Sequence, residues 1–299
     1  MDWLSLVVLA VLQGIAEFLP ISSSGHLALG AYWLNLEGDQ AELSIVLHAG
    51  SLLSILCFYW RRVWALLLED KQVIPKLIVG TIPAAVLGLF IKKLLPDLLG
   101  FDLMEGFSAA LTAALMFPVT GLMLLSITAM KPGKIDYQEL SYGKVFLVGL
   151  FQSFALLPGI SRSGSTIVAG LMCGLKRDSA ATFSFLLAIP AILGASVLEA
   201  KDIYDEGSSI PLPYLLAGAV ISFVVGYVSL VLLVKLVNKG QLHWFAMWVI
   251  PFGLISAIIL LRDYMLSHLP PEPASLLLDL VTTFYNHLWS ANGWAFLGF

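Results

Sequence analysis

The sequence predicts an all-α, polytopic integral membrane protein. Three observations lead to this fold class: 59% of the 299 residues are hydrophobic, only 12% are charged, and the mean hydropathy is +0.91. Apolar runs long enough to cross a hydrocarbon core of ~30 Å also recur along the chain. The formal net charge of −4 gives no indication of nucleic-acid binding.

The chain opens with an apolar run at residues 4–15, which would make ~18 Å of helix, about half of a membrane span. The polar stretch FLPISSSGH (18–26) and another short apolar segment follow. Irregular backbone at membrane depth is tolerated only inside protein or beside a wet cavity. We therefore predict a re-entrant helical hairpin over residues 4–35. Because the start of the chain carries Asp2 and lacks a cleavage site, we expect no signal peptide there.

A second half-length run, at residues 145–157, leads into LLPGISRSG (156–164) and predicts a second hairpin over 145–176. Six segments are long enough to be full transmembrane helices. They lie near residues 42–60, 77–96, 107–130, 179–199, 211–235 and 243–261. Residues 266–299 contain a Pro cluster followed by an apolar, Trp-containing stretch, which predicts a linker and an amphipathic tail at the membrane interface.

The two hairpins align with each other at a shift of 139 residues. QGIAEFLPISSSG (13–25) lies over QSFALLPGISRSG (152–164), and the matches include Gln, Ser and Gly rather than apolar residues alone. We therefore predict one membrane domain over 1–265, with repeats at 1–138 and 139–265. Each repeat would hold a hairpin and three spans, and the odd number inverts the second repeat, as in folds whose site lies near the midplane. Most Lys and Arg residues fall on the inner side if the N-terminus is outside.

The first predicted hairpin contains a carboxylate, three consecutive serines and a histidine, residue types that are typical of a catalytic site. Gln13 and Glu17 are four residues apart and share a helix face, where Glu17 could act as a general base, bind a divalent cation or form a structural pair. Ser22, Ser23 and Ser24 precede Gly25 and a helix start, which favours anion binding, although an N-cap would account for one serine. His26 could exchange a proton with a serine hydroxyl or simply pack.

The second hairpin supplies a cation at the matching place. Ser161, Arg162, Ser163 and Gly164 align with the serine turn, and the Arg162 fork suits phosphate oxygens, with pairing to Glu17 as the structural alternative. Together these groups indicate phosphate-transfer chemistry on a lipid with a phosphorylated head group. The remaining histidines lack comparable neighbours in the sequence and are interpreted as packing or interfacial residues: His48, His243, His268 and His287.

QGIAEFLPISSSGH (13–26) and PGISRSGSTIVAG (158–170) together resemble the undecaprenyl pyrophosphate phosphatases, the bacitracin-resistance proteins. The resemblance covers about residues 1–265 and includes FYWRR (58–62). It implies hydrolysis of undecaprenyl pyrophosphate to undecaprenyl phosphate and inorganic phosphate, which recycles the carrier for peptidoglycan synthesis. It also implies a divalent cation, Mg²⁺ or Ca²⁺, and a site open to the outer, periplasmic face of the bacterial inner membrane.

The resemblance implies Glu17 as the acidic residue, Ser23 and His26 from the first motif, and Arg162 from the second. Our hypothesis is that Ser23 attacks the terminal phosphorus with help from His26, while Arg162 binds phosphate; direct attack by water is the alternative. Glu17, with Gln13 beside it, would bind the cation or orient the nucleophile. The phosphate-binding set would be completed by Ser22, Ser24, Gly25, Ser161, Ser163, Gly164 and Thr166.

A different class of function shares the expected architecture. Inverted repeats with broken helices also occur in transporters, so the same site could bind a polyprenyl phosphate and flip it across the membrane. His26 and the serine triplet favour the phosphatase, because a carrier does not require them. The expected partners are the lipid bilayer and a polyprenyl pyrophosphate, and a homodimer is left open.

Overall fold

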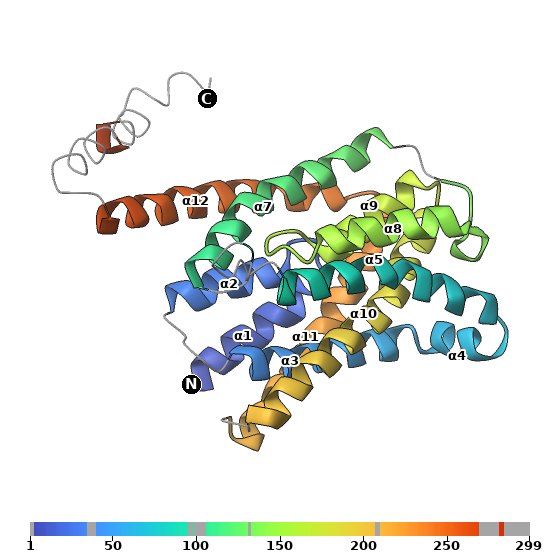
Figure 1. Cartoon of the computed structure of the whole chain (residues 1–299). Helices are drawn as coiled ribbons and strands as arrows, with labels where there is room; N and C mark the ends of the chain where they lie inside the picture. The colour runs from blue at the N-terminus through green and yellow to red at the C-terminus, as the bar shows by residue number, and fades with distance from the viewer. Residues whose placement is uncertain are drawn as a thin grey trace. The chain divides into compact units, whose positions relative to one another are not determined.

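The structure, a computed structural model, describes residues 3–34, 40–94, 98, 106–130, 133–206, 210–268 and 281–283. Its regular elements there are helical, apart from an isolated bridge between Ile135 and Leu175. The principal helices, labelled in Figure 1, are α1 (Trp3–Ala16), α2 (Ser23–Trp33), α3 (Gln40–Phe58), α4 (Trp60–Leu68), α5 (Ile74–Lys93), α7 (Gly106–Ser126), α8 (Tyr142–Phe154), α9 (Arg162–Met172), α10 (Arg177–Glu206), α11 (Leu212–Lys239) and α12 (Ala246–His268). Short 3₁₀ turns lie at Lys71–Val73, Ile127–Ala129, Tyr137–Glu139 and Leu242–Phe245.

Within the described residues, five helices are long and apolar enough to cross a membrane. They cover Lys71–Ile91, Gly106–Ala129, Arg177–Val197, Leu212–Lys239 and Leu242–Ser267. A sixth span is reached if α3 and α4 are counted together, but the chain bends by 73° between them. The predicted span near 42–60 therefore corresponds to α3, and its charged end, FYWRR, continues into the bent helix α4.

In Figure 1, the two helix–turn–helix units, α1–α2 and α8–α9, have their outer ends at opposite ends of the compact unit Met1–Ile255. In α8–α9, the Lys144 Nζ near the start of α8 donates to the Cys173 carbonyl after α9, at 2.8 Å, so both outer ends lie together. In α1–α2, Trp3 stacks on Tyr214 at the start of α11, and Tyr32 contacts Phe107 at the start of α7. Each turn consequently extends inward, from its own end, toward the middle of the unit.

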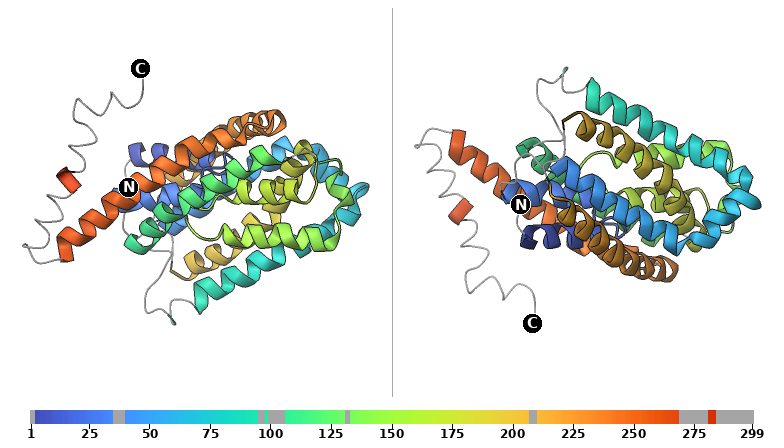
Figure 2. Two further views of the ribbon diagram at one scale, coloured as in Figure 1. Left: turned by 90° about the horizontal axis from the view of Figure 1, so that it is seen from above. Right: turned by 90° about the horizontal axis from the view of Figure 1, so that it is seen from below.

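Small residues let these units pack closely on helices of the other half of the chain. A Cβ atom at Gly14 of α1 would lie 3.0 Å from the Ser222 carbonyl of α11, and one at Gly149 of α8 would overlap the Gly80 carbonyl of α5. Close backbone approach of this kind is typical of helix association in membranes. Figure 2 shows α3 between α10 and α11, and α5 beside α8.

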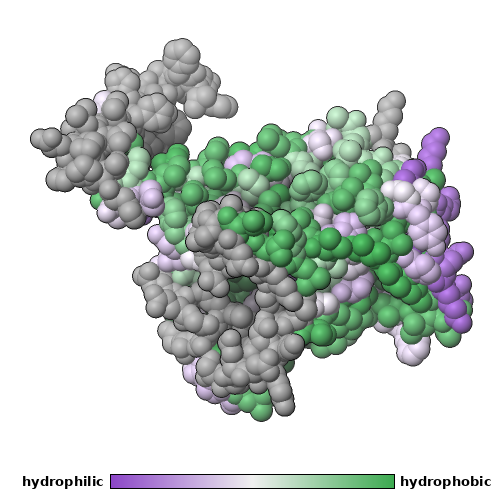
Figure 3. All heavy atoms as spheres, viewed as in Figure 1, coloured by the Kyte–Doolittle hydropathy of each residue, from purple (hydrophilic) through white to green (hydrophobic). Residues whose placement is uncertain are grey.

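Charged side chains gather at the end of the unit where α4 lies, beside a broad apolar surface (Figure 3). There Lys76 donates to the Gln138 carbonyl, and Lys176 contacts Asp136 at 2.7 Å. Hydrogen bonds from Lys176 and Ser179 hold the pKa of the Asp136 carboxyl below its ordinary value. The tail predicted over 266–299 lies outside the described residues, apart from the end of α12 and residues 281–283.

Candidate active site

The turns of the two units repeat one hydrogen-bonding pattern. The Ser22 hydroxyl caps α2 by accepting from the Gly25 N–H at 3.3 Å, and the Ser161 hydroxyl caps α9 by accepting from the Gly164 N–H at 3.1 Å. Each capping hydroxyl also lies beside the serine two residues on, at 3.3 Å from Ser24 and 3.2 Å from Ser163. The sequence forms these turns because a Ser at the N-cap satisfies a backbone donor of the first helical turn.

The two turns touch each other directly. The Gly159 N–H donates to the Ser22 hydroxyl at 3.2 Å, and a Cβ atom at Gly25 would lie 2.7 Å from the Gly159 nitrogen. Thr120 of α7 stabilises the conformation of the second turn, because its hydroxyl donates to the Gly159 carbonyl and accepts from the Ser161 N–H. Ser22 has a φ of 68°, a left-handed conformation that is uncommon for a residue other than glycine and costs ~1–3 kcal/mol.

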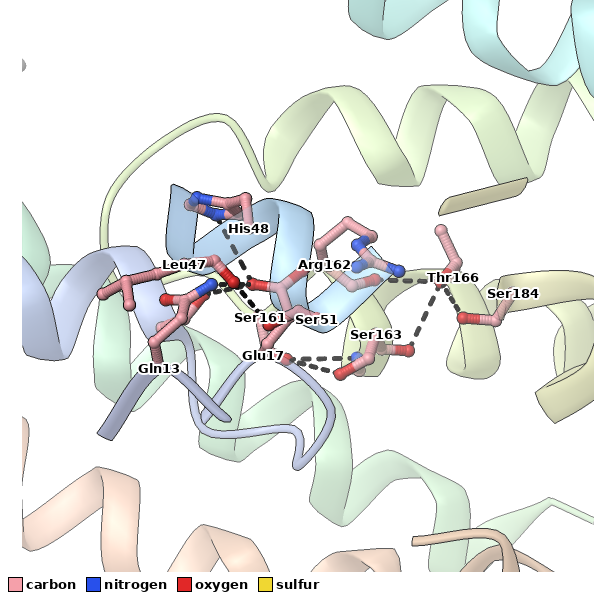
Figure 4. Close-up of polar contacts among 12 residues, drawn as sticks. Gln13, Glu17, Leu47, His48, Ser51, Ser161, Arg162, Ser163, Thr166 and Ser184 are labelled. Carbon is pink, nitrogen blue, oxygen red and sulfur yellow. Dashed lines mark hydrogen bonds and ion pairs between the residues drawn. The ribbon is translucent and has the colours of Figure 1, made fainter. Parts of the chain in front are cut away.

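Glu17 lies where the turns meet and is almost fully buried (Figure 4). Its Oε1 accepts from the Arg162 Nη2 of the second turn at 2.6 Å. Its Oε2 accepts from the Ser23 hydroxyl at 2.8 Å and from the Gln13 amide at 3.1 Å. Ser23 and Arg162 are 139 residues apart and occupy the matching position in each turn. One carboxylate therefore joins both halves of the chain through charge-assisted hydrogen bonds.

The ion pair leaves two buried polar atoms without partners. Arg162 Nη1 and Gln13 Oε1 make no hydrogen bond, although both are inaccessible to solvent. An unsatisfied buried donor or acceptor costs ~1–3 kcal/mol, so such atoms at a site call for a ligand. Pairing with Glu17, which the sequence left open as a structural role for Arg162, is present, and a free N–H of its fork still remains for a phosphate oxygen.

Both ring nitrogens of His26 have hydrogen-bond partners other than the Ser23 hydroxyl. Nδ1 lies 2.8 Å from the Ser22 carbonyl, and Nε2 accepts from the Trp248 indole N–H at 3.2 Å. The ring also stacks on Phe252 and meets the edge of Phe117. As arranged, His26 fixes the carbonyl of the strained turn. The corresponding residue of the second turn, Ser165, donates to the Ser161 carbonyl in the same way.

His48, which the sequence indicated to be a packing or interfacial residue, lies beside the polar cluster. The structure places its Nε2 3.6 Å from Glu17 Oε2, a contact that the sequence did not predict. His48 comes from α3 and follows Ser44 by one helical turn. Within the sequence it stands alone among apolar residues, and a local motif could not have revealed it. Of the other sites expected from the sequence, Thr166 is turned inward and shares hydrogen bonds with the Arg162 carbonyl and Ser184.

The residues around Glu17 fit a divalent cation of the kind that is shared with a phosphate. Within the described chain, no three His, Cys, Asp or Glu side chains lie close enough together to hold a metal by themselves. Mg²⁺-type sites, however, commonly use one or two carboxylates plus substrate oxygens. Glu17 supplies such a carboxylate, the Ser23 hydroxyl lies against it, and the amide of Gln13 carries an oxygen with no partner.

Comparison with known proteins covers most of the chain, from the start of α1 to the middle of α12. The family model of the bacitracin resistance protein BacA matches residues 6–255. A protein of Rhodopirellula baltica named undecaprenyl-diphosphatase is 50% identical over 87% of this chain and 99% of its own length. Proteins of the same name from Desulforapulum autotrophicum and Methanosphaera stadtmanae are each 35% identical, over 84% and 87% of this chain and 96% and 98% of theirs. The chain therefore belongs to the BacA family of bacitracin resistance proteins.

Proposed function

We propose that Glu17, Ser23 and Arg162 form the reaction centre of an undecaprenyl-diphosphatase. The family match and the names of the relatives support the activity, which releases inorganic phosphate from undecaprenyl pyrophosphate and regenerates the monophosphate carrier. One observation carries the assignment of the centre: the hydroxyl of Ser23 and the guanidinium of Arg162 reach the same buried carboxylate from two different turns.

In the reaction that we propose, Ser23 Oγ forms a bond to the terminal phosphorus while the bond to the bridging oxygen breaks. The proton of Ser23 passes to Glu17, its hydrogen-bond acceptor at 2.8 Å. Undecaprenyl phosphate leaves, and water then attacks the phosphorus of the phosphoserine while the bond to Ser23 Oγ breaks. The proton held by Glu17 returns to Ser23 Oγ, and the hydrogens of the water leave with the inorganic phosphate. The free Nη1 of Arg162 would bind the equatorial phosphate oxygens, where charge must be stabilised.

The turns around Ser23 provide further phosphate-binding groups. Ser22, Ser24, Gly25, Ser161, Ser163 and Gly164 present hydroxyls and amides at two helix starts, an arrangement that suits an anion. A divalent cation held at Glu17 would supply positive charge to the pyrophosphate. His26, which contacts the Ser22 carbonyl, would keep the turn in its strained conformation rather than exchange a proton with Ser23.

The chain is a multi-pass membrane protein, and we infer that its two helix–turn–helix units are re-entrant hairpins in inverted repeats. The opposite placement of their outer ends supports this. The end that holds Arg61, Arg62, Lys76, Lys144 and Lys176 would face the cytoplasm, as positive residues generally do. The N-terminus and the opening of the site would then face the periplasm.

Phosphate release from undecaprenyl pyrophosphate by the purified protein tests the proposal. Ser23→Ala should lower kcat by at least ~10³-fold, since it removes the nucleophile. Ser126→Ala, at the end of α7 and far from Glu17 in sequence, is the control and should keep the parent rate. Mass spectrometry after a single-turnover quench should find phosphoserine at residue 23. Normal activity of Ser23→Ala would contradict the assignment, and full activity of the parent without phosphoserine would favour direct attack by water.

A further inference from the structure

The imidazole of His48 faces the reaction centre from a helix that neither sequence motif includes. Its Nε2 lies 3.6 Å from Glu17 Oε2, the same oxygen that accepts from Ser23 and Gln13 (Figure 4). The side chain is 29% exposed, against 7% for that of Glu17. Of these two facing side chains, His48 is therefore the one that solvent, and hence an incoming ion, reaches more easily.

The hydrogen bonds of α3 determine which ring nitrogen of His48 can bind a ligand. Nδ1 lies 2.7 Å from the Ser44 carbonyl and 3.1 Å from the Ser44 hydroxyl. Because the carbonyl can only accept, the shorter of these contacts places the hydrogen of the neutral ring on Nδ1. Nε2 then presents its lone pair toward the carboxylate. Metal-binding histidines usually show this arrangement, in which the second ring nitrogen donates to a backbone carbonyl and fixes the ring.

The distance between the two facing atoms is too long for a good hydrogen bond but suits two ligands of one ion. Ligands bound to a cation at about 2.1 Å are themselves separated by roughly 3–3.5 Å. Nε2 and Oε2 are 3.6 Å apart, a separation at which two lone pairs face each other with no hydrogen between them in the neutral ring. A cation between the atoms would turn this repulsion into attraction.

His26 provides an internal comparison. Its Nδ1 also donates to a backbone carbonyl, that of Ser22, but its Nε2 already accepts from the Trp248 indole at 3.2 Å. The lone pair of His26 is thus occupied. His48 and His26 have the same tautomer and the same carbonyl contact, and His48 alone of this pair directs its lone pair at the carboxylate.

Two oxygen ligands accompany His48 and Glu17. The hydroxyl of Ser23 lies 2.8 Å from Oε2, and turning the Gln13 amide would place its unpartnered Oε1 where Nε2 now lies, 3.1 Å from the same oxygen. We propose that His48 is a ligand of the divalent cation at Glu17, bound through Nε2 beside oxygens of Glu17, Gln13 and Ser23. This inference rests on the proposed function. A mixed set of imidazole and oxygen ligands suits Mn²⁺ better than Ca²⁺, which takes oxygen ligands.

The test uses Mn²⁺ as the probe with the full-length protein in detergent, purified through a tag that contains no histidine. Pulsed electron paramagnetic resonance of bound Mn²⁺ should show the coupling of a directly bound ¹⁴N nucleus. His48→Gln should remove this coupling and weaken Mn²⁺ binding by about tenfold or more. His243→Gln is the matched control, because His243 lies in the 3₁₀ turn Leu242–Phe245 with its Nδ1 3.2 Å from the Gly240 carbonyl. The signal and the Mn²⁺ affinity of this variant should equal those of the parent.

The proposal would be overturned by the absence of saturable Mn²⁺ binding by the parent, by the absence of nitrogen coupling in the parent, or by a coupling that survives in His48→Gln. Glu17→Gln separates this inference from the proposed function. If Glu17→Gln binds Mn²⁺ like the parent but releases no phosphate, the cation lies elsewhere and the ligand assignment fails while the reaction centre stands. If the parent shows the nitrogen coupling but releases no phosphate, the assignment stands and the proposed function fails.

Discussion

The turn before α2 and the turn before α9 share a hydrogen-bonding frame but carry different chemical groups. In both, a capping serine accepts from a glycine N–H three residues on and lies beside a second serine hydroxyl. Between these serines the first turn has Ser23 and the second has Arg162, and both bind Glu17. The position that matches Glu17 is Leu156, so the carboxylate belongs to one turn alone.

The comparison indicates how two similar halves make one asymmetric site. The shared frame of hydroxyls and amides at helix starts suits the negative charge of a phosphate in either half. In the proposed reaction, the differing residues would divide the chemistry between a nucleophile with its base, Ser23 and Glu17, and a cation that binds the substrate, Arg162. The backbone strain is confined to the first of these two turns. Ser22 is held at a φ of 68°, whereas Ser161 has an ordinary extended conformation with a φ of −76°.

Removing the Glu17 carboxylate, which only the first of the two turns carries, should lower the rate of phosphate release the most. Glu17→Gln is expected to lower kcat/KM by about 10³- to 10⁴-fold, because it removes the acceptor for the Ser23 proton and the partner of Arg162. Leu156→Met, at the matching position of the second turn, is a conservative change and should leave phosphate release near the parent rate. Equal losses in the two variants would show that the turns are not functionally distinct.

Weakening the cation of the second turn should have the next largest effect. Arg162→Lys keeps the charge but loses the planar fork, so one ammonium cannot reach Glu17 and a phosphate oxygen in the same geometry. We expect kcat/KM to fall by about 10²- to 10³-fold. Steady-state phosphate release provides the measurement, and Arg61→Lys on the exposed part of α4 is the control. If the Arg162→Lys enzyme had the kcat/KM of the parent, the guanidinium of Arg162 would have no specific role in phosphate binding.

Separating the turns without changing any polar side chain should have a smaller effect. In Gly25→Ala, the new methyl group would lie 2.7 Å from the Gly159 nitrogen, so the turns must move apart. Because a misplacement of about 1 Å can cost 10²-fold in rate, we expect a loss of that order. Gly30→Ala in the same helix meets no atom within 4 Å and should keep its activity. Similar rates for both alanine variants would argue against a need for contact between the turns.

The two buried glutamines at matching positions should show the smallest effect. Gln13 contacts Glu17, whereas both amide atoms of Gln152 are buried without partners. Gln13→Leu should lower activity by about tenfold through the disturbed carboxylate. Gln152→Leu should keep full activity and unfold at the same or a higher temperature, since it removes an unsatisfied polar group. A loss of activity in Gln152→Leu alone would reverse the roles assigned to the two glutamines.

The sequence was informative about local features and uninformative about contacts between distant helices. Residue spacing predicted the serine turns and the pairing of Gln13 with Glu17, because capping and i, i+4 contacts are local. Hydropathy predicted the long apolar helices, although it did not predict the 73° bend after α3. The place of His48 beside Glu17 depends on how α3 packs against the first turn, and the occupied nitrogens of His26 depend on Trp248, 222 residues away.

A double-mutant cycle on Ser23 and Arg162 tests most directly whether the two turns act as one centre. The measurement is kcat/KM for phosphate release by the parent, Ser23→Ala, Arg162→Gln and the double variant, with thermal unfolding as the check that each is folded. We predict that Arg162→Gln lowers kcat/KM by about 10²- to 10³-fold in the parent but has little further effect in Ser23→Ala. The reason is that the losses caused by removing groups that act as a unit do not add. Equal losses in both backgrounds would mean that the two turns contribute independently, and would contradict the account.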